Sequence, residues 1–388
     1  MRLLLLQDAA YFPSYGGGNK ANRLLMTALA ARGHECVVVC KAVTRGTLTR
    51  RPDEVELSAR NIDHERDAQG CVRYRYQNVE VQTLDLSSGR FRAEIADTIG
   101  QTQCDWVLVS DDKTHVLLDA ALSAAPGRVV MAVHTHMHLP FGPEGQRENA
   151  HQLASMRETS GIVAASEYIR SYLHRHADLP STALHFPVYG TGPFPAPIRP
   201  QEGYVTLINP CLVKGLPIFL ELAAAFPDVA FAAVPTWGAA PEVLDALKIA
   251  GNIRLLPPSD DIGKLLQQTR ILLVPSLIPE TFGYVAVDAM LRGIPVMASD
   301  LGGLPEGKLG VDYLLPVRPA RHNGDSYEAP AQDLGPWHDT LHALLSDRDL
   351  YGRCSHDSRE AATAFVGSID VSAFEYYFDS LHSARARG

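Results

Sequence analysis

The sequence predicts an α/β protein whose two halves are each built on a parallel sheet. Short apolar runs alternate with helical stretches in both halves, and continuous apolar strands are typical of parallel sheets covered on both faces. A proline-rich segment, residues 180–203, lies between the halves and has the composition of an inter-domain linker. The length of 388 residues is enough for two hydrophobic cores.

The first half opens on a strand, a helix and a second strand. Residues 3–6 and 36–40 form the apolar strands, and the helix between them, at about 21–32, has one apolar face. Gly33 stands just past this helix, where a glycine commonly ends one. Further strands of this half are expected at 79–83, 106–110, 129–133 and 161–165.

The second half repeats this alternation after the proline-rich segment. Its helices are expected to begin near Leu216, Pro241, Ile262 and Tyr284. A last helix, at about 372–384, follows the second sheet and carries several aromatic residues, so it must pack on another part of the protein. The strands of this half are expected at 205–208, 229–234, 253–256, 271–274 and 295–299.

Composition and charge exclude several classes of protein. Apolar residues make up 46% and charged residues 20% of the chain, which is typical of a globular protein. The net charge of −9 argues against a nucleic-acid partner and against contact with a membrane surface. No apolar run approaches the ~18–20 residues of a membrane span, and the leucines at 3–6 indicate a strand rather than a secretory signal. Six cysteines without a C-x-x-C pair predict reduced thiols and a cytoplasmic protein.

The segment 275–306 holds the richest set of candidate functional residues. Glu280 is expected at the carboxyl end of a strand, and Thr281–Gly283 open a helix whose free amide groups would suit a phosphate. Asp288 follows two helical turns later, so the two acids could reach successive hydroxyls of a sugar-rich ligand. Alternatively, Glu280 caps the helix and Asp288 forms a solvated pair with Arg292. Spacing alone leaves both alternatives open.

This segment resembles the E-x7-E signature of the family 4 GT-B glycosyltransferases, retaining enzymes that use nucleotide sugars. The match includes Ala289-Met290, the run Gly293-Ile294-Pro295-Val296 and the run Gly302-Gly303-Leu304-Pro305-Glu306. The second acid of the signature is normally Glu and is Asp288 here. The resemblance implies that Glu280 contacts the transferred sugar, that Asp288 contacts the ribose of the donor, and that Thr281, Phe282 and Gly283 bind the donor at the helix start.

Two loops at the strand ends also resemble parts of this family. Gly16, Gly17 and Gly18 resemble its opening glycine loop, which lies near the donor phosphates and the acceptor; the resemblance places Asn19 and Lys20 on the acceptor side. The same glycines satisfy the dinucleotide pattern G-x-G-x-x-A. However, residues 7–15 separate them from the first strand, and Cys40-Lys41 stands where that pattern needs an acid, so a nicotinamide dehydrogenase is disfavoured.

In the second half, residues 209–215 resemble the family's G-R-x4-K-G loop, whose Arg and Lys neutralise the diphosphate. Lys214 is present, but Asn209-Pro210 replaces Gly-Arg, so one cation is missing or comes from elsewhere in the chain. The resemblance keeps Asn209 and Lys214 as donor-binding residues and gives Lys214 a catalytic role on the leaving group.

Three histidines, His134, His136 and His138, follow the strand at 129–133. Their alternate spacing would place three imidazoles on one side of an extended segment, which is a conceivable metal site. The resemblance implies instead that no metal is needed and that His134 faces the transferred sugar. His136 and His138 are then acceptor-side residues, with a purely structural role as the alternative for both.

Taken over the whole chain, the resemblance implies the GT-B fold: two Rossmann-like domains that face each other across a cleft. Domain 1–190 would bind a small-molecule acceptor, and domain 204–365 would bind the nucleotide sugar. The last helix, within 366–388, would cross back to the first domain. The implied reaction is retaining glycosyl transfer, with the nucleotide sugar as co-substrate and no other cofactor. A nucleotide-sugar 2-epimerase and an inactive nucleotide-sugar-binding protein are the alternatives.

Overall fold

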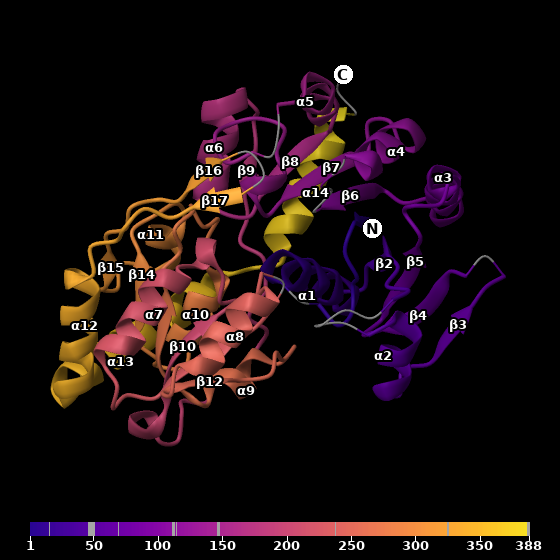
Figure 1. The fold of residues 1–388 in the computed structure, drawn as a ribbon. Coiled ribbons are helices and arrows are strands. Elements are labelled where there is room, and N and C mark those ends of the chain that lie inside the picture. The colour runs from indigo at the N-terminus through magenta and orange to yellow at the C-terminus, as the bar shows by residue number, and fades with distance from the viewer. Residues whose placement is uncertain are drawn as a thin grey trace. The chain divides into compact units, whose positions relative to one another are not determined.

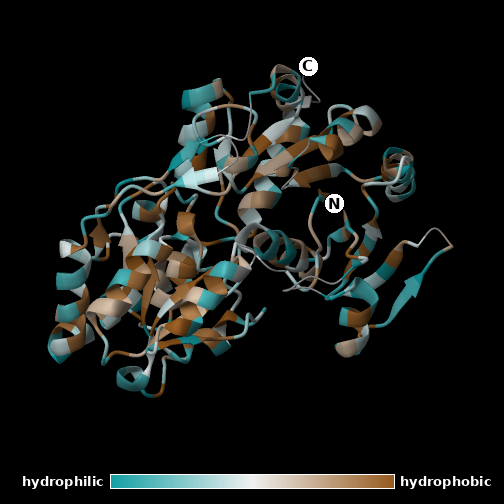
Figure 2. Cartoon of the chain, viewed as in Figure 1, coloured by the Kyte–Doolittle hydropathy of each residue, from teal (hydrophilic) through white to brown (hydrophobic). Residues whose placement is uncertain are grey.

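The computed structural model describes residues 1–14, 16–45, 51–68, 70–110, 113, 115–145, 148–236, 238–323 and 326–385 (Figure 1). The chain forms two compact units. The first unit consists of Met1–Gly190 together with Ile369–Gly388, and the second unit of Thr191–Ser368. Each unit has its own sheet, and Figure 2 shows apolar residues gathered on the strands of both sheets. The predicted fold class, two α/β halves with parallel sheets, is confirmed.

The sheet of the first unit has nine strands in the order β3-β4-β5-β2-β1-β6-β7-β8-β9. The seven strands from β5 to β9 in this order are parallel, as the apolar runs predict. Strands β3 and β4 add an antiparallel edge that the sequence analysis does not predict. The strands are β1 (Arg2–Gln7), β2 (Glu35–Lys41), β3 (His64–Arg66), β4 (Val72–Tyr76), β5 (Val79–Leu84), β6 (Trp106–Ser110), β7 (Val129–Val133), β8 (Gly161–Ala164) and β9 (Thr182–Ala183).

Helices connect these strands, and the first of them begins a turn earlier than predicted. Gly17 and Gly18 belong to α1, and only Gly16, with φ 102°, lies before it as the N-cap. The predicted start at residue 21 is therefore wrong. Gly33 has φ 90°, which fits its predicted place after the helix. The helices are α1 (Gly17–Ala31), α2 (Asp53–Ala59), α3 (Phe91–Thr102), α4 (Val116–Ala124), α5 (Ala150–Arg157), α6 (Glu167–Ala177), α14 (Ser372–Arg385) and the 3-10 helix η1 (His136–His138).

The last helix, α14, packs on the first unit through the aromatic residues that the sequence singles out. Phe378 stacks on Trp106 with ring centroids 6.3 Å apart, and Phe374 contacts Phe186 edge-on at 5.0 Å. Phe374 and Phe378 are fully buried. Burial of these large rings helps to hold α14 in place. Of the range 366–388, residues 386–388 lie outside the described residues.

The sheet of the second unit has six parallel strands in the order β12-β11-β10-β13-β14-β15. A small antiparallel hairpin, β16 with β17, was not predicted from the sequence. The strands are β10 (Tyr204–Ile208), β11 (Phe231–Val234), β12 (Ile253–Leu255), β13 (Thr269–Val274), β14 (Val296–Ser299), β15 (Leu314–Leu315), β16 (Arg321–Asn323) and β17 (Ser326–Glu328).

The helices of the second unit begin where the sequence analysis expects them at Leu216, Pro241, Ile262 and Tyr284. They are α7 (Leu216–Ala225), α8 (Pro241–Ile249), α9 (Ile262–Leu266), α10 (Tyr284–Met290), α11 (Leu304–Gly307), α12 (Gly335–Ser346) and α13 (Arg348–Ser368), with the 3-10 helices η2 (Pro200–Glu202) and η3 (Leu212–Lys214).

Candidate functional site

Each sheet contains a point at which the strand order changes direction. In the first unit β1 lies between β2 and β6, and in the second unit β10 lies between β11 and β13. Ligands of open parallel sheets bind outside the carboxyl ends of the strands at such points. The residues that follow β1 and β6, and those that follow β10 and β13, are therefore the places to look for a site.

Beyond β13, the backbone around Glu280 is held tightly by the glycines of the next loop. Glu280 and Gly302 form an isolated parallel bridge, and the Gly303 amide donates to the Glu280 carbonyl oxygen at 2.6 Å. A Cβ on Gly302 would lie 2.5 Å from that same oxygen, and one on Gly303 would lie 2.4 Å from the Thr281 carbonyl oxygen. Only glycine fits at these two positions, so the paired glycines fix where Glu280 stands.

The Glu280 carboxylate contacts two residues of this edge of the sheet. Its Oε1 accepts hydrogen bonds from the Lys214 ammonium and from the Ser276 hydroxyl. Lys214 ends η3, and the following Gly215 lies so close to the loop after β13 that a Cβ would meet the Pro275 carbonyl oxygen at 2.0 Å. The side chains of Lys214 and Glu280 are 23% and 17% exposed, so both are accessible to a ligand. The structure thus brings together two predicted site residues, and adds Ser276, which the sequence analysis missed.

Counted back from Lys214-Gly215, the eight-residue pattern G-R-x4-K-G begins at Ile208, so Asn209 stands where its Arg is expected and the predicted match of Asn209-Pro210 to Gly-Arg is wrong by one position. Asn209 has φ 62°, a conformation that glycine adopts freely and that Asn tolerates better than most other residues. Its buried side-chain oxygen accepts a hydrogen bond from the Gly238 amide at 2.9 Å. Asn209 therefore adopts a backbone conformation that favours glycine, and it ties the loops after β10 and β11 together.

The residues after Glu280 open α10 without a side-chain cap. Gly283 is the N-cap with φ 92°. Phe282 is fully buried and its ring lies 5.6 Å from that of Phe365, so its side chain belongs to the core. A ligand contact from Phe282 would have to come from its backbone. The donor contacts expected of Thr281, Phe282 and Gly283 remain predictions.

Asp288 and Arg292 form a pair on α10 and the turn after it, but the pair is buried. The Arg292 Nη1 atom donates to the Asp288 carbonyl oxygen at 2.7 Å and lies 3.5 Å from the Asp288 Oδ1 atom. The two side chains are only 6% and 8% exposed, so the solvated pair considered from the sequence is wrong. The Arg292 guanidinium also lies 5.5 Å from the centre of the Phe194 ring. The ribose contact of Asp288 remains a prediction.

In the first unit, His134 belongs to a buried polar network at the ends of β1, β6 and β7. Its Nε2 atom lies 2.8 Å from Asn22 Oδ1, and the Asn22 amide nitrogen donates to Gln7 Oε1 at 3.2 Å and to Ser110 Oγ at 2.9 Å. Because the Asn22 oxygen can only accept, the proton of the neutral imidazole sits on Nε2. Burial lowers the pKa of His134 to about 3, so the ring is uncharged at neutral pH.

The sequence analysis missed Asn22, the partner of His134, and Gln7 and Ser110, the partners of Asn22. A polar residue on the buried face of an amphipathic helix was the available signal for Asn22. Gly16, Asn19 and Lys20, the other predicted residues of this loop and helix start, lie together at the N-terminus of α1, where the Lys20 amide donates to the Gly16 carbonyl oxygen at 3.1 Å.

The three histidines do not share one side of an extended segment, because His136–His138 forms the 3-10 helix η1. The Thr135 hydroxyl caps this helix by accepting a hydrogen bond from the Met137 amide at 3.2 Å. His136 is buried against the rings of Tyr168 and Tyr172, whereas burial and the nearby Lys113 lower the pKa of His138 to about 4. Within the described residues, no group of His, Cys, Asp and Glu side chains has an arrangement that could hold a metal ion.

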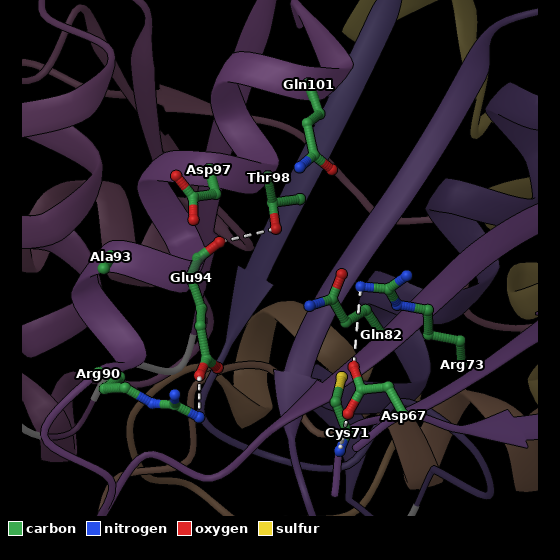
Figure 3. Close-up of a pocket in the computed structure, with 10 residues that line it drawn as sticks. All are labelled: Asp67, Cys71, Arg73, Gln82, Arg90, Ala93, Glu94, Asp97, Thr98 and Gln101. Carbon is green, nitrogen blue, oxygen red and sulfur yellow. Dashed lines mark hydrogen bonds and ion pairs between the residues drawn. The ribbon is translucent and has the colours of Figure 1, made fainter. Parts of the chain in front are cut away.

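A separate pocket lies against α3 and strands β4 and β5 of the first unit (Figure 3). It has a volume of about 290 Å³ and is crossed by ion pairs from Asp67 to Arg73 at 3.8 Å and from Arg90 to Glu94 at 3.9 Å. It includes none of the predicted site residues.

Comparison with known proteins assigns both units to one family. The model described as Glycosyltransferase Family 4 matches residues 15–186, and the model described as Glycosyl transferases group 1 matches residues 204–323. Both matches include the strand-end loops described above. The chain belongs to glycosyltransferase family 4. The resemblance stated from the sequence is therefore confirmed.

The curated relatives match only part of this family 4 chain. A D-inositol 3-phosphate glycosyltransferase of Mycobacterium sp. (strain KMS) is 33% identical over 163 residues, which are 38% of this chain and 34% of that protein. A protein of the same description from Mycolicibacterium smegmatis is 31% identical over 196 residues, 47% of this chain and 41% of its own length. The matched segments thus span about a third to two fifths of these relatives.

Solved structures match the family 4 chain over nearly its whole length. Sucrose-phosphate synthase from Thermosynechococcus elongatus has a TM-score of 0.71 at 16% identity and covers 99% of this chain and 100% of its own. HepE of Anabaena, solved in complex with UDP-glucose, has a TM-score of 0.66 at 16% identity and covers 98% and 99%. These likenesses establish the GT-B fold. Across the described residues, none of the helices has the length and apolarity needed to cross a membrane.

Proposed function

We propose that this chain transfers a sugar from a nucleotide-diphosphate sugar to a small hydroxyl-bearing acceptor, with retention of the anomeric configuration. The observation that carries the proposal is the contact of Lys214 and Ser276 with Glu280 at the carboxyl ends of β10 and β13. It sets a cation beside an acceptor-only carboxylate at the switch point of the second unit. A diphosphate needs the first group, and sugar hydroxyls need the second.

In this proposal Lys214 stabilises the leaving group. The bond between the anomeric carbon and the phosphate oxygen breaks, the acceptor oxygen forms a new bond to the same face of that carbon, and the acceptor proton passes to the leaving phosphate oxygen. Negative charge develops on the diphosphate in this step, and a fixed ammonium beside it favours the transition state. Glu280, held in place by Gly302 and Gly303, accepts hydrogen bonds from the sugar and orients it.

His134 is assigned a binding role rather than a proton-transfer role. Its pKa of about 3 keeps the imidazole neutral, and its Nε2 proton is used by Asn22. A base or acid for proton transfer is most effective with a pKa near the working pH, which His134 lacks. Its remaining Nδ1 lone pair suits a hydroxyl of the transferred sugar. This supports a mechanism in which the leaving phosphate itself takes the acceptor proton.

The identity of the substrates is proposed from the relatives. UDP-glucose is the first donor to test, because HepE was solved with it, and D-inositol 3-phosphate is the first acceptor to test, because the annotated relatives are named for it. The six cysteines are all free and buried, which supports the proposed location in a reducing compartment, the cytoplasm.

The test is a transfer assay with both substrates, followed by mass spectrometry of the product. Glu280→Ala is expected to lower turnover by at least ~10²-fold, the scale of a lost electrostatic contact in a transition state. Glu221→Ala, an exposed acid of α7, is the matched control and should leave turnover unchanged. Conversion of the donor into an isomeric nucleotide sugar without any acceptor would favour a 2-epimerase. Donor binding without turnover under any condition would favour an inactive binding protein.

A further inference from the structure

His115 stands between β6 and α4 in the first unit, and neither its backbone nor its side chain is explained by helix formation. It is the N-cap of α4, a position at which Ser, Thr, Asp or Asn would normally bond a free amide, but its side chain makes no cap hydrogen bond. Its φ of 57° is in the left-handed region, which strains a residue with a Cβ. Backbone strain of this kind persists where the surrounding structure imposes it and is common at functional sites.

The His115 imidazole is buried, with 1% of the residue exposed, and one of its nitrogens is unused. The Nε2 atom lies 3.4 Å from the His138 carbonyl oxygen, which can only accept, so Nε2 carries the proton. Nδ1 is then a bare acceptor, and it has no hydrogen-bond partner in the described part of the chain. Burial also lowers the pKa of His115, which keeps the ring neutral. A buried acceptor without a hydrogen bond lowers the stability of the folded state. The presence of His115 is therefore not explained by stability.

The surroundings of His115 place this acceptor with the other candidate residues of the first unit. Lys113, His115 and His136 lie close enough to His138 to lower its pKa, and the His115 ring reaches the His138 carbonyl oxygen. His134, at the end of the neighbouring strand β7, has the same arrangement: its Nε2 proton is bonded by Asn22, and its buried Nδ1 has no partner among the described residues. The neutral imidazoles of His115 and His134 thus each have a buried Nδ1 acceptor without a partner among the described residues. They follow the adjacent strands β6 and β7.

We propose that His115 is a binding residue for the acceptor substrate and that its Nδ1 atom accepts a hydrogen bond from an acceptor hydroxyl. This inference rests on the proposed glycosyl transfer, and it adds that the enzyme recognises a hydroxyl group of the acceptor. A phosphate or carboxylate offers only lone pairs and would be repelled by Nδ1, whereas a hydroxyl can donate. The residue therefore selects for a polyol or sugar ring on the acceptor.

Substitution of His115 by Asn or by Gln tests separately whether its Nδ1 atom binds a ligand and whether its Nε2 atom has only a structural role. Asn tolerates a positive φ and places its side-chain oxygen near the position of Nδ1, so His115→Asn keeps the proposed acceptor. His115→Gln places its amide near the position of Nε2 and leaves the Nδ1 position empty. His115→Phe retains a ring and removes both nitrogens. His151→Asn, an exposed position on α5, is the control.

The measurements are the KM for D-inositol 3-phosphate, the affinity for myo-inositol by calorimetry, and the acceptor-independent release of UDP from UDP-glucose. We expect His115→Gln and His115→Phe to raise the acceptor KM about 10- to 100-fold, with His115→Asn close to wild type. Release of UDP without acceptor, in which water takes up the sugar, should be unchanged in all variants, because this hydrolysis does not involve the acceptor. A melting curve for each variant checks that it is folded.

The opposite order, with Gln rescuing and Asn failing, would show that the Nε2 contact with His138 matters and would overturn the proposal. Equal acceptor KM for the folded Phe variant and wild type would also overturn it. Failure of wild type to bind either polyol would overturn the ligand class. Failure of wild type to bind UDP-glucose by calorimetry would instead reject the proposed glycosyl transfer, so the two failures are distinguishable.

Discussion

The Arg32 guanidinium and the Glu375 carboxylate form a two-point ion pair although 343 positions separate them in sequence. The Nε and Nη2 atoms of Arg32 donate to the two carboxylate oxygens at 2.8 and 2.7 Å, and His34 Nε2 lies 2.7 Å from Glu375 Oε1. Parallel contacts of this kind are the most specific form of the Arg–carboxylate pair. They join the C-terminal end of α1 to the last helix of the chain.

Glu375→Gln is expected to destabilise the docking of α14 in a pH-dependent way. Arg32 and His34 lower the pKa of Glu375 to about 2 from its ordinary 4.5. The pair therefore adds stability above pH 4.5, and this contribution is lost as the pH falls from 4.5 towards 2. The difference in melting temperature between wild type and Glu375→Gln should be largest near neutral pH and should shrink in acid. Glu360→Gln, exposed on α13, is the control, and a pH-independent difference would contradict the assignment.

Lys214→Ala is expected to weaken the binding of a nucleoside diphosphate. A charged hydrogen bond to a phosphate contributes about 1.5–3 kcal/mol, so calorimetry with UDP should show a loss of about 10- to 100-fold in affinity. The loss should be large because Asn209 stands where the family's G-R-x4-K-G loop has its Arg, the second cation. Lys248→Ala, on the exposed face of α8, provides the comparison. Unchanged affinity for UDP in the folded Lys214 variant would mean that another cation holds the diphosphate.

Gly302→Ala is expected to lower both stability and turnover. The new methyl group would meet the Glu280 carbonyl oxygen at 2.5 Å, and φ at this position is 67°, which disfavours any residue with a Cβ. Such overpacking costs about 1–3 kcal/mol, and moving the loop displaces Glu280. Thermal unfolding and the transfer assay measure the two effects. Gly251→Ala, which meets nothing within 4 Å, should change neither. A fully active Gly302 variant would show that the position of Glu280 is unimportant.

Lys308 provides a second pH-dependent prediction, in the alkaline range. Its buried ammonium donates to the carbonyl oxygens of Val296 and Asp312, both at 2.7 Å, and burial lowers its pKa to about 8 from 10.5. The folded state therefore releases the proton more readily than the unfolded state, and this group adds stability as the pH rises from 8 to 10.5.

Lys308→Met should remove that contribution. The melting temperature of wild type relative to the Met variant is expected to increase between pH 7 and about 10, because only the wild type carries the titrating group. Lys248→Met, at an exposed lysine of α8, should run parallel to wild type. A constant difference between wild type and Lys308→Met over this range would exclude a lowered pKa for Lys308.

The local elements of the fold were largely predictable, and the exceptions have physical reasons. Strands buried in a parallel sheet read as continuous apolar runs, so strands such as β6 and β7 were predicted at their observed bounds. Strand β4, Val-Arg-Tyr-Arg-Tyr, alternates between buried and exposed residues and was missed. The hairpin β16–β17 is largely exposed, and it gives no apolar signal at all.

By itself, the sequence determined the two α/β halves, the family, and a set of candidate residues that includes Glu280 and Lys214. Apolar periodicity and motif spacing are properties of neighbouring residues, and the chain displays them directly. The tertiary structure decided which side chains meet. Glu280 meets Lys214 from 66 positions away, and His134 meets Asn22 from 112 positions away. Such contacts depend on strand order and register, because the order in which strands pair decides which strand ends are neighbours. The Nδ1 atom of His115 is likewise decided by tertiary structure. Burial and the contact of Nε2 with the His138 carbonyl oxygen make it an acceptor without a partner among the described residues.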